Sequence, residues 1–398
     1  MTGSLEFSDL ALIGAVALLG PLLAWRRSWR LPVVFGEILA GIAVGASGLG
    51  WLDASDPGFA QLAVVGFALV MFVAGTHVPV RDRELLQGLW PAAGRVVAVA
   101  ALAVALGWAV ASLVDSDHAL LYGVIMASSS AALVLPLLDS LSLGGPDVTR
   151  LLPQVALADA VCIVALPLVI DPARAGTAAL GAIAVISAAV LLFVVLRYFD
   201  RSGLRRRIHH VSAKRGLALE LRFNLVVLFA LGALAVATNV SVMLAGFAFG
   251  MVVAMIGEPR RLARQVFGLA EGFLGPVFFV WLGASLSLRE LWDQPRMVLL
   301  GLALGFGAIA CHSAMRVTGQ PAAAGVLAAA ELGVPMAAVA LAEPAGTLAP
   351  GEGPALLLGA LVTVVAAILA GRRLAVRGGS PDEALGADVS PRTLSGTP

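Results

Sequence analysis

Residues 151–170 read LLPQVALADAVCIVALPLVI, and they place one carboxylate, Asp159, in the middle of an otherwise almost entirely apolar segment. About twenty residues is the length that an α-helix needs to cross a bilayer. A charged side chain at the centre of such a helix costs roughly 2.5–3.5 kcal/mol, so an intramembrane carboxylate indicates a functional site. Asp159 is therefore the first candidate. The alternative is a structural role, in which Asp159 only hydrogen-bonds a neighbouring helix.

The composition is that of a polytopic membrane protein. Hydrophobic residues make up 60% of the chain and charged residues 13%, whereas soluble domains are about a quarter charged. The mean hydropathy is +0.95. A net charge of +1, with basic residues in short clusters, gives no reason to expect nucleic-acid binding. Cys162 and Cys311 lie in apolar segments, where packing is their expected role, and no cofactor is implied.

Apolar windows of about 19 residues predict about thirteen membrane-spanning helices. The expected spans are Asp9–Trp25, Leu31–Gly48, Gly58–Val78, Leu89–Val114, Ala119–Ser140, Leu151–Ile170, Ala175–Leu196, Ala218–Thr238, Val242–Ile256, Val266–Ser285, Met297–Met315, Pro321–Leu341 and Pro354–Gly371. Basic residues gather in every second connection, from Arg26 to Arg377, while the other connections hold only Arg174, Arg289 and Arg296. By the positive-inside rule, the N-terminus is expected outside and the C-terminus in the cytoplasm.

The longest polar interruption, Arg197–Arg222, indicates a division into repeats. Within a transmembrane domain over residues 1–377, we expect a first repeat at about 9–170, a linking helix at about 175–196 and a second repeat at about 218–371. An odd number of spans between the repeats gives them inverted topology. The polar tail, residues 378–398, is expected to be disordered.

Two of the predicted spans carry polar residues and helix breakers in their middle. These are Ser128, Ser129, Ser130 and Pro136 in one span, and Glu331, Gly333 and Pro335 in the other. Proline lacks a backbone N–H and glycine tolerates irregular backbone, so both spans are expected to unwind locally. Unwound segments at matching positions of two repeats are typical of a transporter's substrate site, where free carbonyls can hold a cation.

The predicted depths of these residues in the membrane place them at about the same level. Asp159 lies about nine residues from the cytoplasmic end of its span, near 13 Å at 1.5 Å per residue, and Glu331 and the three serines lie about ten residues into theirs. The candidate proton- and cation-binding residues are Asp159, Glu331, Ser128, Ser129 and Ser130, with Asp159 as the group that would bind a monovalent metal cation. Alternatively, the serines bond back to their own helix and a neighbour holds Glu331.

Some residues are candidates for a supporting role around Asp159. Gln154 precedes it by five positions and Cys162 follows it by three, so only Cys162 is expected on the same helix face. Ala158 directly precedes it.

Two further polar residues are expected near the ends of their spans. Glu37 lies about six residues from a cytoplasmic end, where it is expected to reach water or an arginine. His312 lies about four residues from such an end, too shallow to meet Asp159 directly.

Six segments then resemble the monovalent cation:proton antiporter superfamily, in particular its second branch of bacterial sodium/proton and potassium/proton exchangers. They are PVVFGEILAGIAVGASGLG (32–50), GFALVMFVAG (66–75), ASSSAALVLPLL (127–138), LADAVCIVALP (157–167), MLAGFAFGMVVA (243–254) and FLGPVFFVWLGASLSL (273–288). The resemblance implies an all-helical sodium/proton antiporter-like fold with crossed discontinuous helices. It also implies a homodimer in the bacterial plasma membrane, and Asp159 as the carboxylate that alternately binds a proton and a cation.

This sequence departs from the family pattern at three places. Family members usually have Asn or Asp where Ala158 stands, and charge-moving members have a lysine in the helix that matches 297–315, where this chain reads GFGAIA at 305–310. Ala329 and Ala330 replace the usual Arg-Gly or Gly-Gly. With no lysine partner, one carboxylate predicts electroneutral exchange of one Na⁺ or K⁺ for one H⁺.

Other functions remain open on the sequence. Small residues around Asp159 would also suit an ion-coupled transporter of an organic solute or a bulkier cation, or the chain could be a non-transporting relative. An enzyme is not expected, because no nucleophile and histidine share the level of Asp159 and no His-Glu-x-x-His occurs.

Overall fold

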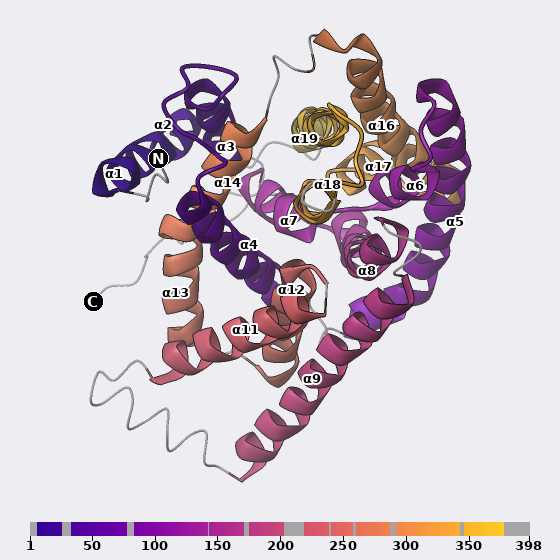
Figure 1. Ribbon diagram of the computed structural model, residues 1–398. Coiled ribbons are helices and arrows are strands. Elements are labelled where there is room, and N and C mark those ends of the chain that lie inside the picture. Colours follow the sequence, from indigo (N-terminus) through magenta and orange to yellow (C-terminus); the bar gives the residue numbers. More distant parts are fainter. Residues whose placement is uncertain are drawn as a thin grey trace, which may run out of the picture.

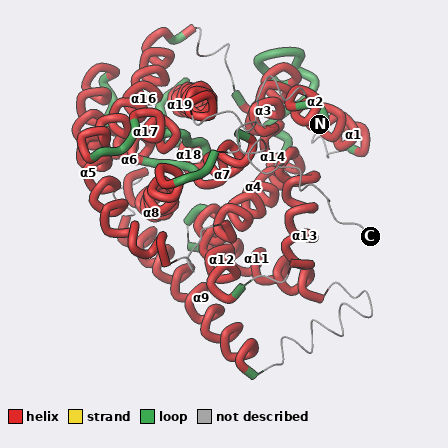
Figure 2. Tube along the Cα trace, turned by 180° about the vertical axis from the view of Figure 1, so that it is seen from behind, coloured by secondary structure: helices red, strands yellow, loops and turns green. Residues whose placement is uncertain are grey.

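The computed structural model describes residues 6–25, 33–77, 83–141, 143–170, 175–202, 219–238, 240–257, 260–286, 291, 293–342 and 346–377. Within these ranges every regular element is a helix and no strand occurs (Figure 2). Nine helices of the described part are long and apolar enough to cross a membrane. The predicted tail at 378–398 and several of the basic connections fall outside the described residues.

Every predicted span coincides with one helix or with two or three consecutive helices (Figure 1). The helices are α1 (Phe7–Ala17), α2 (Leu19–Ala24), α3 (Val33–Val44), α4 (Pro57–His77), α5 (Arg83–Val114), α6 (Ala119–Ala127), α7 (Ala131–Ser140), α8 (Pro146–Ile170), α9 (Ala175–Arg201), α11 (Leu219–Ala237), α12 (Val242–Ile256), α13 (Arg260–Leu269), the π-helix η2 (Ala270–Leu274), α14 (Gly275–Ser285), α16 (Pro295–Ser313), the 3₁₀ helix η3 (Ala314–Thr318), α17 (Ala322–Ala328), α18 (Gly333–Ala342) and α19 (Glu352–Arg377). The number of membrane crossings and their orientation stay predictions.

The helices form two groups. In one group, α5–α8 pack with α16–α19 through pairs such as α5 with α16, and α8 with α18. In the other, α3 packs on α14, and α4 on both α12 and α14. The long helix α9 contacts α8 at one edge and α11 and α12 at the other (Figure 1). The two groups therefore meet along a surface that includes α8, the helix that carries Asp159.

Glycines bring the helices of the second group into backbone contact. A Cβ atom at Gly250 of α12 would overlap the carbonyl oxygen of Phe72 in α4, and one at Gly75 of α4 would overlap that of Phe247. Gly41 of α3 and Gly283 of α14 are interlocked in the same way. Small residues that let backbones approach are the usual means of packing helices in a membrane.

A polar cluster joins the first residues of α6 to those of α19. Nδ1 of His118 lies 2.8 Å from Oε1 of Glu352, and the hydroxyl of Tyr122 donates to the same oxygen at 2.6 Å. The N–H of Ala349 donates to Oε2 at 2.8 Å. The Glu352 side chain is only 1% exposed and that of His118 is 22% exposed, so the pair is shielded from solvent more than a surface ion pair.

This cluster predicts a pH dependence of stability. The hydrogen bond with Glu352 raises the pKa of His118 above its ordinary value, and the charge of Asp117 acts in the same direction. A group with a raised pKa in the folded state stabilises the protein fully below its ordinary pKa of about 6.5, and this stabilisation is lost as the pH rises through the raised pKa. We expect the melting temperature to fall as the pH rises from about 6.5 through the raised pKa of His118.

His118→Gln should flatten this dependence. Asp115→Asn is the matched control, because Asp115 pairs with Arg296 at 3.6 Å on a surface where both side chains are more than 70% exposed, and such pairs contribute little. Thermal unfolding of the purified protein across the pH range measures both effects. An unchanged slope in His118→Gln would refute the assignment.

Candidate functional site

Two broken helices cross at the centre of the first helix group. α6 ends at Ala127 and α7 begins at Ala131, while α17 ends at Ala328 and α18 begins at Gly333. The N–H of Ser130 in the first break donates to the carbonyl of Ala330 in the second, at 2.9 Å. The predicted local unwinding of both spans is thereby confirmed. No lipid group could supply this bond, so each break provides a partner for the other.

The prolines do not mark the breaks as the sequence suggested. Pro136 lies at the sixth residue of α7, after the break has ended, and Pro335 lies at the third residue of α18. Proline is tolerated in a first helical turn, where the N–H has no intrahelical partner. The serines themselves form the first break, and Ala329 to Leu332 form the second.

Asp159 lies against the first break. Its Oδ2 accepts a hydrogen bond from the N–H of Ala131, the first residue of α7, at 3.0 Å. The residue is 2% exposed. The N-terminus of a helix carries unsatisfied N–H groups and a partial positive charge, so it is a favourable neighbour for a carboxylate. The side chain thus has a structural role, because it accepts a hydrogen bond from the first residue of α7 beside the crossing.

Glu331 lies within the second break. Its N–H donates to Oγ1 of Thr363 in α19 at 3.2 Å, and the Thr363 hydroxyl donates to the carbonyl of Ala360 at 2.7 Å. Both carboxylate oxygens of Glu331 are buried and have no hydrogen-bond partner among the described residues. Glu331 and Asp159 are close enough for their charges to interact. Thr363 thus binds the backbone N–H of Glu331, while the carboxyl group of Glu331 has no partner among the described residues.

The three serines play different parts. The hydroxyl of Ser128 donates to the carbonyl of Ile125, at 2.9 Å, within its own helix. Oγ of Ser129 is buried without a partner in the described part of the chain. Ser130 contributes its backbone N–H to the crossing. The expectation that serines might only bond back to their helix therefore holds for the hydroxyl of Ser128.

The supporting residues are all buried. Cys162 is 5% exposed, Ala158 is 1% exposed and Gln154 is fully buried. Cys162 follows Asp159 by three residues in α8, so the two side chains lie on the same side of that helix. Both amide atoms of Gln154 lack a hydrogen-bond partner among the described residues. Nothing in the contacts of Gln154 places it next to Asp159.

Several buried polar atoms at the crossing of the two broken helices lack a hydrogen-bond partner among the described residues. Buried polar atoms almost always have partners, yet Ser129 and both oxygens of Glu331 have none within the described ranges. A proton on a carboxylate, a water molecule or a cation would supply such a partner. The described residues hold no group of three His, Cys, Asp or Glu side chains that could bind a metal ion. A cation here would depend on one or two carboxylates, with hydroxyls and unwound carbonyls as further ligands.

Two further residues belong to this region. Thr363 escaped the sequence analysis, although it is the one polar side chain in the apolar run at 354–371. His312, expected too shallow to meet Asp159 directly, is 1% exposed, and its ring lies beside the backbone of Met126, Ala127 and Ser128 at the end of α6. No direct contact with Asp159 occurs among its described interactions. For Thr363, a lone polar residue in an apolar span was the available signal.

The family assignment follows from a match over most of the chain. A family model described as "Sodium/hydrogen exchanger, transmembrane" matches residues 14–374. This chain belongs to that family. It is a multi-pass membrane protein, and the resemblance noted in the sequence is confirmed.

Several relatives within the family carry antiporter names. The Na⁺/H⁺-K⁺ antiporter GerN of Bacillus cereus is 24% identical over 77% of this chain and 79% of its own length. The glutathione-regulated potassium-efflux system protein KefC of Salmonella paratyphi B (strain ATCC BAA-1250 / SPB7) is 27% identical over 75% of this chain and 48% of its own length. YjbQ of Bacillus subtilis (strain 168), provisionally named a Na⁺/H⁺ antiporter, is 23% identical over 74% of this chain and 50% of its own length. The match thus spans about half the length of YjbQ and KefC.

A solved structure supports the same fold. The sodium proton antiporter MjNhaP1 from Methanocaldococcus jannaschii superimposes with a TM-score of 0.64, covering 92% of this chain and 97% of that one. The sequences are 15% identical, so the likeness concerns the fold. The predicted antiporter-like fold with crossed discontinuous helices is confirmed.

Thr363 allows a test of the second break. Thr363→Val keeps the shape of the side chain but leaves the buried N–H of Glu331 without its acceptor, a loss of about 1–3 kcal/mol. Thr363→Ser keeps the hydroxyl. We expect a clearly lower melting temperature for Thr363→Val than for Thr363→Ser in thermal unfolding of the detergent-solubilised protein. Equal stability of Thr363→Val and the parent protein would show that this bond does not support the break.

Proposed function

We propose that this chain is a secondary antiporter that exchanges a monovalent cation, Na⁺ or K⁺, for H⁺, with Asp159 binding each of them in turn. The observation that carries the proposal is the position of Asp159 in a sodium/hydrogen exchanger fold. It is a buried carboxylate, hydrogen-bonded to the first residue of α7, at the crossing of two broken helices. The antiporter names of GerN and YjbQ agree with this function.

Electrostatics couples the two fluxes. An empty, charged Asp159 is costly in a low-dielectric interior, and a bound proton or monovalent cation neutralises it. Both loaded forms therefore change sides more readily than the empty form. Because one site carries either load, a proton can move one way only when a cation moves the other way. Ser129 and Glu331 are the further groups with which a cation or its water could interact, since their side-chain oxygens lack partners among the described residues.

The exchange is proposed to be electroneutral. One carboxylate binds one proton or one monovalent cation, so each cycle moves one positive charge in each direction. The middle of α16, residues 305–310, reads GFGAIA and offers no basic side chain that could carry a second charge.

The orientation, the membrane and the oligomeric state of the protein are part of the same proposal. The basic connections support a cytoplasmic C-terminus and an external N-terminus, and the bacterial relatives support the plasma membrane. The resemblance to the antiporter superfamily supports a homodimer surrounded by lipid. The two inverted repeats with α9 between them remain the proposed domain organisation.

Asp159→Asn tests the exchange directly. In acid-loaded proteoliposomes, external Na⁺ or K⁺ should drive proton efflux through the parent protein, and the variant should lose at least about nine-tenths of the rate because its amide cannot take up a proton or balance a cation. Asp147→Asn is the matched control, since Asp147 is an exposed carboxylate in the first turn of the same helix. No response to either ion in a folded parent protein would overturn the proposal.

Electroneutrality has its own test. The rate of cation-driven proton efflux should stay the same when a membrane potential of either sign is imposed on the proteoliposomes, because no net charge crosses. A current that reverses with the membrane potential would instead require unequal numbers of protons and cations. Protein-free liposomes and Asp159→Asn provide the background for both measurements.

A further inference from the structure

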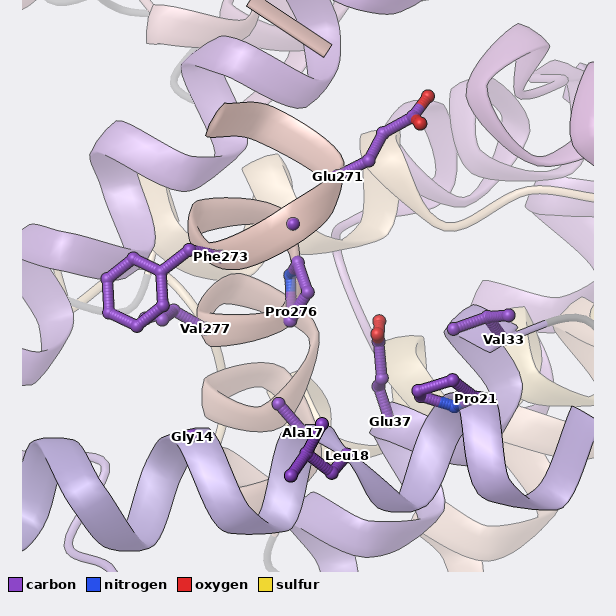
Figure 3. Close-up of a pocket in the computed structure, with 11 residues that line it drawn as sticks. Gly14, Ala17, Leu18, Pro21, Val33, Glu37, Glu271, Phe273, Pro276 and Val277 are labelled. Carbon is purple, nitrogen blue, oxygen red and sulfur yellow. The ribbon is translucent and has the colours of Figure 1, made fainter. Parts of the chain in front are cut away.

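A second polar site lies away from Asp159, in the other helix group. A pocket of about 270 Å³ opens between the N-terminal helices, α3 and the segment formed by η2 and α14 (Figure 3). Its lining includes Leu18 and Pro21 from the N-terminal helices, Val33 and Glu37 from α3, Glu271 from η2 and Pro276 from α14. The walls are mainly apolar, and two of the side chains are carboxylates.

Glu37 is the deeply buried one of the two acids. The residue is 3% exposed, which corrects the expectation that it reaches water at the membrane surface. None of the hydrogen bonds or ion pairs found among the described residues involves its carboxylate. The side chain points along the pocket toward the end at which Glu271 lies (Figure 3). Burying a charged carboxylate without a partner costs free energy. A bound ligand that carries a positive charge would offset this cost.

Gly20 makes room for this side chain. A Cβ atom at Gly20 would lie 2.5 Å from Cγ of Glu37 and 2.9 Å from the carbonyl oxygen of Val33. Any larger residue at position 20 would therefore push the stem of Glu37 away from α2. The close approach of α2 and α3 thus holds the carboxylate in the pocket.

The polar groups of the pocket are hydrogen-bond acceptors. Pro21 and Pro276, two of its lining residues, have no N–H to donate. No basic, hydroxyl or amide side chain is among the lining residues of the described chain. Two carboxylates and no side-chain donor among the described lining residues favour a cation that donates hydrogen bonds.

The size and the apolar walls define the cation further. A water molecule occupies about 30 Å³ of liquid, so a bare alkali ion would leave most of the pocket unfilled. We propose that this pocket binds an organic ammonium ion, with the ammonium group at Glu37 and an apolar substituent against Val33 and Val277. A primary ammonium has three donors, and its bond to a carboxylate is charge-assisted.

Such a ligand has two possible sources. Leu18 and Phe273 border the pocket and are 60% and 41% exposed, so the pocket adjoins an apolar surface of a membrane protein. A lipid with an ethanolamine headgroup could enter from that surface, and a soluble alkylamine could enter from water. Both present the same ammonium group, and the proposal does not depend on exchange at Asp159.

The test measures binding of n-butylammonium to the full-length protein in nanodiscs of phosphatidylcholine. A ligand that binds the folded state raises the melting temperature in a concentration-dependent way, which yields a dissociation constant. Tetramethylammonium is the control ion, because it has the same charge and no N–H donor. We expect n-butylammonium alone to stabilise the parent protein, Asp159→Asn and Asp147→Asn.

Two variants locate the site. Glu37→Gln should weaken n-butylammonium binding by about tenfold or more, as expected for the loss of a charge-assisted bond. Glu271→Gln, at an exposed position, should weaken it less and keeps the test available if Glu37→Gln does not fold. Equal effects of both ions on the parent protein, or unchanged affinity in both variants, would overturn the proposal. Nanodiscs that contain phosphatidylethanolamine separate the sources: loss of n-butylammonium binding identifies the lipid, and unchanged binding identifies a soluble amine.

Discussion

Backbone that leaves the helical pattern inside a membrane must find its hydrogen-bond partners within the protein, because hydrocarbon offers none. Here the two breaks are connected by the bond from Ser130 to Ala330. A neighbouring helix then serves each break, through Asp159 for the N–H of Ala131 and through Thr363 for the N–H of Glu331. The candidate ion site is therefore part of the scaffold that stabilises the unwound chain, and its residues cannot be changed independently of that scaffold.

The two helices that serve the breaks are not equivalent. α8 and α19 occupy corresponding places in the two halves, each after a broken helix, yet one offers a carboxylate and the other a hydroxyl. Thr363 satisfies its break completely and remains neutral. Asp159 satisfies its break and still has charge to balance. The same kind of backbone hydrogen bond is thus made by a neutral hydroxyl in one half and by a carboxylate, the proposed binding group, in the other.

Sequence reasoning succeeded where a single segment contains the whole signal. Apolar length predicted the helices, and the polar residues in the middle of two spans predicted where they break, because both depend on local chemistry. It failed where the outcome depends on a partner from another helix. The acceptor role of Thr363, the backbone contact of Ser130 and the burial of Glu37 against Gly20 all depend on packing between segments far apart in the chain.

The glycine contacts of α4 with α12 and of α3 with α14 have a mechanical consequence. Backbones that touch at interlocked glycines cannot slide past one another without collision, so this half of the molecule is stiff. The helix group around Asp159 meets it through contacts of α7 with α4 and of α8 with α12, which lack such interlocking at the glycines described. Any movement that exposes Asp159 first to one side of the membrane and then to the other would then take place along this boundary. The helices packed at the glycines would stay in place.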